Sequence, residues 1–179
     1  MTVLKATSVY TSVIRIDYTL TLAVHPAVTA LVKPVSNKPT PWNDKYFVPV
    51  SCFLVQAVFD WFGRSLATLT QWPSPGRKAE IGSLICVILR AGFIPLIMTC
   101  HVLPMERNTQ ILFPYDWAYI GFFAAFNIAG GYISNVALML GPKQVGVEHQ
   151  EVAGSILILA LVIGLGIGSL IGPGLVGLL

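Results

Sequence analysis

Long runs of apolar residues, separated by short polar connections, dominate the chain. A helix needs about 20 mostly apolar residues to cross the hydrocarbon core of a bilayer. Stretches of about that length predict five membrane-spanning helices, at about residues 13–32, 46–70, 81–103, 117–140 and 152–179. The first stretch is the weakest, because Asp17, His25 and several threonines interrupt it. Residues 1–12 are expected to form a polar N-terminal segment ahead of this five-helix bundle.

The overall composition agrees with this pattern. Of the 179 residues, 55% are hydrophobic and 11% are charged, and the mean hydropathy is +0.73. Soluble domains carry about 25% charged residues, so this chain has too few charges to cover a water-exposed surface. The composition excludes a soluble enzyme and a disordered chain, and a net charge of +3 does not favour nucleic acid as a partner. We expect an all-α, polytopic helical bundle whose surroundings are the lipid bilayer.

Patterns typical of catalysis or of cofactor binding are missing from the sequence. Three cysteines, an odd number, do not predict a disulfide framework. The three histidines are not spaced as metal ligands, and we find no nucleophile–base pair, phosphate-binding loop or haem-ligand pattern. We therefore expect a protein that is not an enzyme and that binds no metal or cofactor.

The second predicted span carries two charges, Asp60 and Arg64, near its middle. Each charge at that depth costs about 2.5–3.5 kcal/mol on insertion scales. Because the two residues are four positions apart, they share a helix face and can form an ion pair. Phe53 and Gln56 lie one or two turns earlier on about the same face. Ionisable groups inside a membrane usually mark a substrate or ion pathway, and the alternative is an ion pair that only joins helices.

Arg90 is a further charge, near the middle of the third predicted span. We expect it to contribute to helix packing by binding a carboxylate or carbonyl group on a neighbouring helix. Asp60, the one acid deep inside the last four predicted spans, is the candidate partner. In the first span, Pro26 frees a backbone carbonyl and permits a kink, which is either a simple bend or part of a gate.

Small residues predict close helix contacts in the last two spans. Gly164, Gly168 and Gly172 recur at four-residue spacing in the last span, which indicates a face for tight helix packing. The fourth span contains small and amide side chains that either only pack or also bind a neighbouring helix or a solute. These residues are Asn127, Gly130, Gly131 and Asn135, and Tyr132 lies among them.

Several motifs together resemble those of the equilibrative nucleoside transporters. The segments Tyr-Phe-Val-Pro-Val-Ser-Cys-Phe-Leu at 46–54 and Phe-Asp-Trp-Phe-Gly-Arg-Ser-Leu at 59–66 resemble the eighth transmembrane helix of that family. Other motifs resemble its seventh, ninth, tenth and eleventh helices in the same order. They begin at His25, Leu89, Gly131, Gly141 and Glu151. The resemblance covers about residues 16–179.

The resemblance implies a facilitative transporter that moves nucleosides, and in some members nucleobases, by alternating access. Members of the family have eleven helices in a major-facilitator-like arrangement of six plus five. This chain resembles the five-helix C-terminal half, helices seven to eleven, so we expect it to need a complementary N-terminal half or an oligomer.

The resemblance also implies roles for individual residues. Asp60 and Arg64 would contact the nucleoside, largely through its ribose, and Phe53 and Gln56 would complete this part of the substrate site. Pro26, flanked by His25 where the family has an aromatic residue, would belong to the exterior gate, to which Phe53 also contributes. Glu151 would help to close the cytoplasmic side.

The sequence differs from the family pattern at three places. Ala57 and His25 stand where the family frequently has asparagine and an aromatic residue, and Ala129-Gly130 replaces a common Ser-Asn pair. Two functions therefore remain as hypotheses: a partial nucleoside transporter, and a non-transporting structural or regulatory subunit that associates through its Gly-rich last helix. A small helical channel has weaker support. In each case we expect a multi-pass integral membrane protein, with the plasma membrane as its location.

Overall fold

The computed structural model describes residues 3–36, 38–70, 76–102 and 111–178. Within these ranges the regular structure is helical, with two isolated β-bridges and no strand, which confirms the all-α prediction. The α-helices are α1 (Val3–Ala6), α2 (Ser8–Val24), α3 (Val55–Thr70), α4 (Arg77–Ala91), α5 (Phe93–Met98), α6 (Asp116–Leu140) and α7 (Gln150–Gly177). Short 3-10 turns lie at Thr29–Leu31, Pro142–Gln144 and Val147–His149, and π-helical turns lie at Trp42–Tyr46 and Pro49–Leu54.

Three helical segments of the described chain are long and apolar enough to cross a membrane. They are Arg77–Met98, Asp116–Gln144 and Val147–Gly177. The helices of the first two predicted spans, α2 with 17 residues and α3 with 16, are not among these three. Helix α2 ends at Val24, directly before the cis peptide bond between His25 and Pro26. Helix α3 carries Gln56, Asp60 and Arg64. The π-helical turns lie directly before its N-terminal end.

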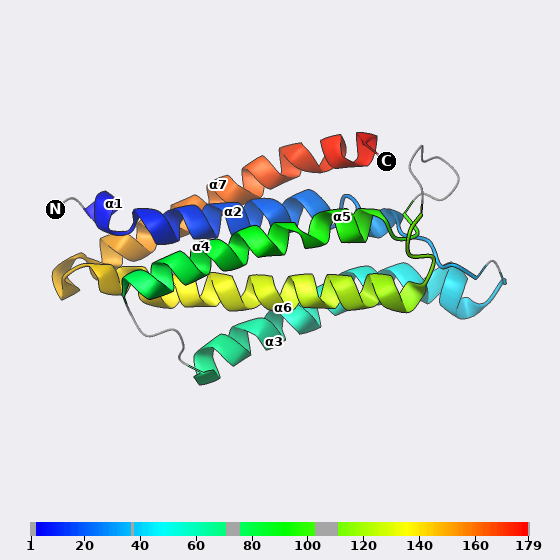
Figure 1. The fold of residues 1–179 in the computed structure, drawn as a ribbon, viewed down its shortest axis with the longest axis horizontal. Helices are drawn as coiled ribbons and strands as arrows, with labels where there is room; N and C mark the ends of the chain where they lie inside the picture. Colours follow the sequence, from blue (N-terminus) through cyan, green and yellow to red (C-terminus); the bar gives the residue numbers. More distant parts are fainter. Residues whose placement is uncertain (1–2, 37, 71–75, 103–110, 179) are drawn as a thin grey trace.

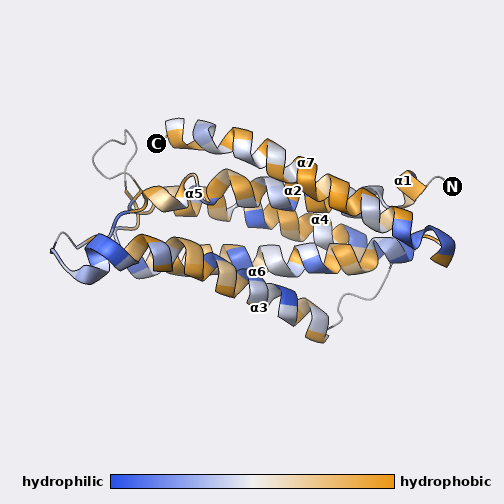
Figure 2. Cartoon of the chain, turned by 180° about the vertical axis from the view of Figure 1, so that it is seen from behind, coloured by the Kyte–Doolittle hydropathy of each residue, from blue (hydrophilic) through white to orange (hydrophobic). Residues whose placement is uncertain are grey.

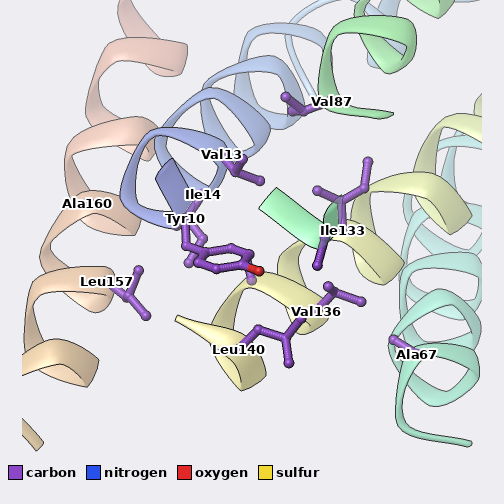
Figure 3. Close-up of a cluster of buried hydrophobic side chains, with 12 residues drawn as sticks. Tyr10, Val13, Ile14, Ala67, Val87, Ile133, Val136, Leu140, Leu157 and Ala160 are labelled. Atoms are coloured by element: carbon purple, nitrogen blue, oxygen red, sulfur yellow. The ribbon is translucent and has the colours of Figure 1, made fainter. Parts of the chain in front are cut away.

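The helical bundle begins earlier than the apolar pattern predicts. Helix α2 starts at Ser8, inside the segment 1–12 that was expected to be a polar extension. Tyr10, Val13 and Ile14 lie on one helix face and are completely buried. They pack into a cluster that includes Leu157 of α7 and side chains of α6, as Figure 3 shows.

The helices run along one long bundle, with the two chain ends at its opposite ends (Figure 1). Helix α2 lies against α7 on one side and against α4 and α6 on the other, while α3 packs mainly against α6. The most extensive helix pairs are α2 with α7 and α3 with α6. The polypeptide therefore forms two close helix pairs, α2 with α7 and α3 with α6. Contacts of α2 with α6 join the two pairs, and α4 packs against both α2 and α6.

Glycines permit both close pairs. In α7, a methyl group added at Gly164 or Gly168 would lie 2.5 Å from a backbone carbonyl oxygen of α2. At Gly63 of α3 and Gly131 of α6, an added methyl group would overlap the backbone of the opposite helix. Such approaches leave no space for a larger side chain. Close backbone packing of this kind holds helices together in membranes, where no hydrophobic effect drives their association.

The outward surface of the bundle is apolar between two polar ends. Figure 2 shows hydrophobic residues along the helices and hydrophilic residues gathered at the connections. Large apolar side chains on α4 and α7 are exposed: Ile85, Ile88, Leu89, Leu159, Val162 and Leu170. An apolar surface of this extent is unusual on a soluble monomer. It fits a surrounding of lipid acyl chains, as expected for an integral membrane protein.

Candidate functional site

Asp60 and Arg64 form an ion pair on α3. The Arg64 Nε donates to the Asp60 Oδ2 at 2.7 Å, and Nη2 lies 3.4 Å from Oδ1. The side chains retain 35% exposure at Arg64 and 27% at Asp60, so neither is enclosed by its own bundle. Each group can therefore still bind a solute, the carboxylate as an acceptor and the guanidinium as a donor.

A tyrosine of α2 joins this ion pair. The Arg64 Nη2 donates to the phenolic oxygen of Tyr18 at 3.1 Å, which links α2 to α3. Sequence reasoning did not identify Tyr18, because it is 46 residues away and lies in an ordinary helical stretch. Only the fold, in which α2 and α3 both pack against α6, brings the phenol to the guanidinium.

Helix α6 holds the backbone around the ion pair in place. Gly131 of α6 lies against the carbonyl of Asp60, and Gly63 of α3 lies against the carbonyl of Ile128. Asn135 donates from Nδ2 to the carbonyl oxygen of Arg64 and to the Thr68 Oγ1, both at 2.9 Å. The ion pair is thus carried by a rigid two-helix contact rather than by a loop.

Arg90 binds Asp17 and not Asp60, so the expected partner was wrong. Its Nη1 donates to the Asp17 Oδ1 at 2.7 Å and to the Asp17 carbonyl oxygen at 2.9 Å. Both residues are 2% exposed. Asp60 is already held by Arg64 on the same helix, whereas Asp17 reaches Arg90 from a different helix. Asp17, which interrupts the apolar pattern of the first predicted span, therefore neutralises the charge of Arg90 in the third.

Two further hydrogens of the Arg90 guanidinium also have partners. Nη2 donates to the Thr21 Oγ1 and Nε donates to the Phe126 carbonyl oxygen, each at 2.9 Å. The guanidinium carbon lies 3.9 Å from the centre of the Phe126 ring, a cation–π distance. Gly130 provides the space, because a Cβ there would collide with the guanidinium. Arg90 therefore joins α2, α4 and α6.

The residues assigned to the exterior gate lie together at the end of α2. The His25 ring meets the Phe53 ring edge-on at 5.4 Å and stacks on Phe123 at 6.0 Å. Its Nδ1 is 3.3 Å from the Thr29 Oγ1 and 3.4 Å from the Cys52 Sγ. Phe53 itself is 50% exposed.

The other predicted site residues are more dispersed. Pro26 is exposed beside His25, and Gln56 is half-buried on α3, one turn before Asp60. Glu151 is exposed in the first turn of α7, which begins at the end of the bundle opposite to the one where α2 ends (Figure 1). The predicted gate residues therefore occupy opposite ends of the bundle.

The three glycines that were predicted to pack helices make their contacts within this bundle. Gly164, Gly168 and Gly172 are buried, and each faces α2 or the residues that directly follow it. In the part of the chain that the structure describes, no group of three or more His, Cys, Asp or Glu side chains could hold a metal ion.

Comparisons with known proteins agree on one family. The family described as nucleoside transporter matches residues 1–173. Equilibrative nucleoside transporter 2 of Mus musculus is 39% identical over 152 residues, which cover 85% of this chain and 32% of that protein. Equilibrative nucleoside transporter 1 of Homo sapiens is 36% identical over 167 residues, which cover 93% of this chain and 36% of that protein. The chain therefore spans about a third of the length of these relatives, which are transporters and not enzymes.

Proposed function

The chain belongs to the nucleoside transporter family, and from this premise we propose that it forms one helical bundle of a facilitative nucleoside transporter. In this proposal the bundle corresponds to the five-helix C-terminal half, with α2 and α3 crossing the membrane together with the three longer segments. The observation that carries the proposal is the Asp60–Arg64 ion pair, which lies part-exposed on α3.

The chemistry of this ion pair suits a ribose. A carboxylate accepts hydrogen bonds from sugar hydroxyls, and a guanidinium donates to hydroxyl or ring oxygens. Charge-assisted bonds of this kind are roughly twice as strong as neutral ones. Phe53 and Gln56 lie earlier on the same helical segment, where an aromatic ring can pack on a base or sugar and an amide can bind polar base atoms. A nucleobase without sugar would lose the contacts to Asp60 and Arg64.

Alternating access assigns roles to the two ends of the bundle. His25, Pro26 and Phe53 form the exterior gate, and Glu151 contributes to closure at the cytoplasmic end. Bundles of this kind enclose a substrate near the membrane midplane and rock around it. Asp60 lies against Gly131 in the interior of the long helix α6, and this supports a position of the ion pair between these ends.

The transporting unit needs a second bundle. Helix α3 contacts α6 on one side, and its other side exposes large apolar residues: Val58, Trp61, Phe62, Leu66 and Leu69. These flank the ion pair and offer a surface on which a complementary N-terminal half can pack. The alternative of a non-transporting subunit has less support, because the Gly-rich face of α7 is already covered by α2.

Uptake of radiolabelled adenosine tests the proposal. Cells without nucleoside uptake of their own would express the chain alone, or together with the N-terminal remainder of the mouse relative. We expect saturable uptake at the plasma membrane only with both parts, and its loss in Asp60→Asn. Asp44→Asn, which changes an exposed acid outside the helical core, is the matched control. Uptake that Asp60→Asn leaves unchanged at equal surface expression would contradict the site assignment.

A further inference from the structure

The Tyr18 hydroxyl is oriented by Arg64 so that one hydrogen remains to be donated. A guanidinium has hydrogens and no acceptor, so in the 3.1 Å contact with Arg64 Nη2 the phenolic oxygen is the acceptor. The phenol keeps its own O–H hydrogen. Among the described residues, no hydrogen bond donated by Tyr18 is found.

The position of the ring is defined by packing. Tyr18 is half-buried on α2 and packs against the cluster around Tyr10, Ile14 and Leu157. It follows Asp17, whose side chain and carbonyl are held by Arg90. The packing of the ring and the contacts of the adjacent Asp17 therefore both support the position of Tyr18 beside Arg64. A side chain that is held before the ligand arrives loses little conformational freedom on binding.

The three side chains differ in what they offer a solute. Asp60 offers lone pairs, Arg64 offers the hydrogens of Nη1, and Tyr18 offers one O–H hydrogen beside a positive charge. Hydrogen bonds in a chain polarise one another, so an O–H whose oxygen accepts from a guanidinium is a stronger donor. This combination matches a sugar, in which each hydroxyl both donates and accepts.

We propose that Tyr18 is a third substrate-contacting residue, which donates its O–H to an oxygen of the nucleoside sugar. The inference rests on the proposed function, since it concerns the same site. It adds a contact from α2 to the contacts from α3, so that the sugar is held between the two helices. The site then selects for the sugar oxygens by both accepting from them and donating to them.

A purely positioning role for Tyr18 makes a different prediction. If the phenol only oriented Arg64, its loss would affect the same sugar oxygen as Arg64→Lys, because Arg64 itself is proposed to contact the sugar. If it binds one sugar oxygen directly, its loss would weaken adenosine but not the analogue that lacks this oxygen. The two roles can therefore be separated by a cycle of protein and substrate changes.

The experiment measures inhibition of labelled adenosine uptake by adenosine and by its 2′-, 3′- and 5′-deoxy analogues, using the full chain with its complementary half. Wild type, Tyr18→Phe, Arg64→Lys and the control Tyr10→Phe are compared at equal surface expression. Tyr10→Phe makes the same change on the same helix, where the hydroxyl is buried and has no hydrogen-bond partner among the residues that the structure describes. We expect Tyr18→Phe to weaken inhibition by adenosine by about 2- to 10-fold. In wild type, an analogue that lacks the contacted oxygen should inhibit more weakly than adenosine, and in Tyr18→Phe most of this difference should disappear.

Each outcome decides something different. An equal loss for adenosine and all three analogues, a loss with the same analogue pattern as Arg64→Lys, or no loss at all would overturn the inference and leave the proposed function intact. Absence of saturable adenosine uptake in wild type would overturn the proposed function, and the inference with it. A selective loss that Tyr10→Phe does not reproduce supports both.

Discussion

Replacing Asp17 should destabilise the bundle strongly, because it would leave the charge of Arg90 buried without its ion-pair partner. Asp17 and Arg90 are each 2% exposed and their charged atoms are 2.7 Å apart. Removing one member of a buried ion pair costs about 3–5 kcal/mol, because the other charge stays buried and unpaired. Asp17→Ala should cost about this amount.

Asp17→Asn should cost less than Asp17→Ala. The amide oxygen can still accept one hydrogen bond from Arg90, which restores about 1 kcal/mol. The backbone carbonyl of Asp17, the Thr21 hydroxyl and the Phe126 carbonyl remain as neutral acceptors in both variants. We therefore expect a cost of about 2–4 kcal/mol for the amide, the difference between these two effects.

The double variant Asp17→Leu with Arg90→Met separates burial of charge from loss of packing. Replacing both members of a buried pair by apolar side chains is often neutral or stabilising, so the double variant should be more stable than either single variant. Reversible unfolding in mixed micelles, followed by loss of helical signal, gives the free energies of unfolding. Single variants that lose less than about 1 kcal/mol, or a double variant whose loss equals their sum, would refute the argument.

Three further predictions concern packing and can be measured with the same unfolding assay. Gly168→Ala should reduce the free energy of unfolding by about 1–3 kcal/mol, because the added methyl group would collide with the Thr19 carbonyl. Gly166→Ala, where the methyl group would face open space, should be neutral or slightly stabilising. Equal effects would contradict the close contact between α2 and α7. Tyr10→Phe should leave stability unchanged or raise it by about 1 kcal/mol, since its buried hydroxyl has no hydrogen-bond partner in the described part of the chain. A clear loss would show that the hydroxyl has one. Asn135→Ala should cost about 0.6–1.7 kcal/mol through its two hydrogen bonds to α3, and no change would mean that those bonds are not formed in the membrane.

The sequence predicted what depends on neighbours along the chain. The Asp60–Arg64 contact follows from four-residue spacing on one helix, and the apolar stretches predicted the helical class. Contacts between helices could not be predicted in this way. Periodicity places Asp17 and Tyr18 on α2, but it does not say which helix each one faces.

The ends of the helices were also hard to predict. A polar composition suggested that residues 1–12 lie outside the bundle, yet Tyr10 is completely buried. One side chain in each turn is enough to bury a helix face, even where the residues between them are polar. Similarly, the second span was predicted from the number of apolar residues. That number does not reveal the π-helical turns that precede α3.

Adenosine counterflow in liposomes tests the central claim most directly. Vesicles containing the chain and its complementary half would be loaded with unlabelled adenosine and diluted into a trace of labelled adenosine. A facilitative carrier with Asp60 and Arg64 in its site predicts transient accumulation of label in wild type, and its absence in Asp60→Asn and in vesicles without protein. Accumulation that persists in Asp60→Asn, or wild-type vesicles that behave like empty ones, would contradict the account.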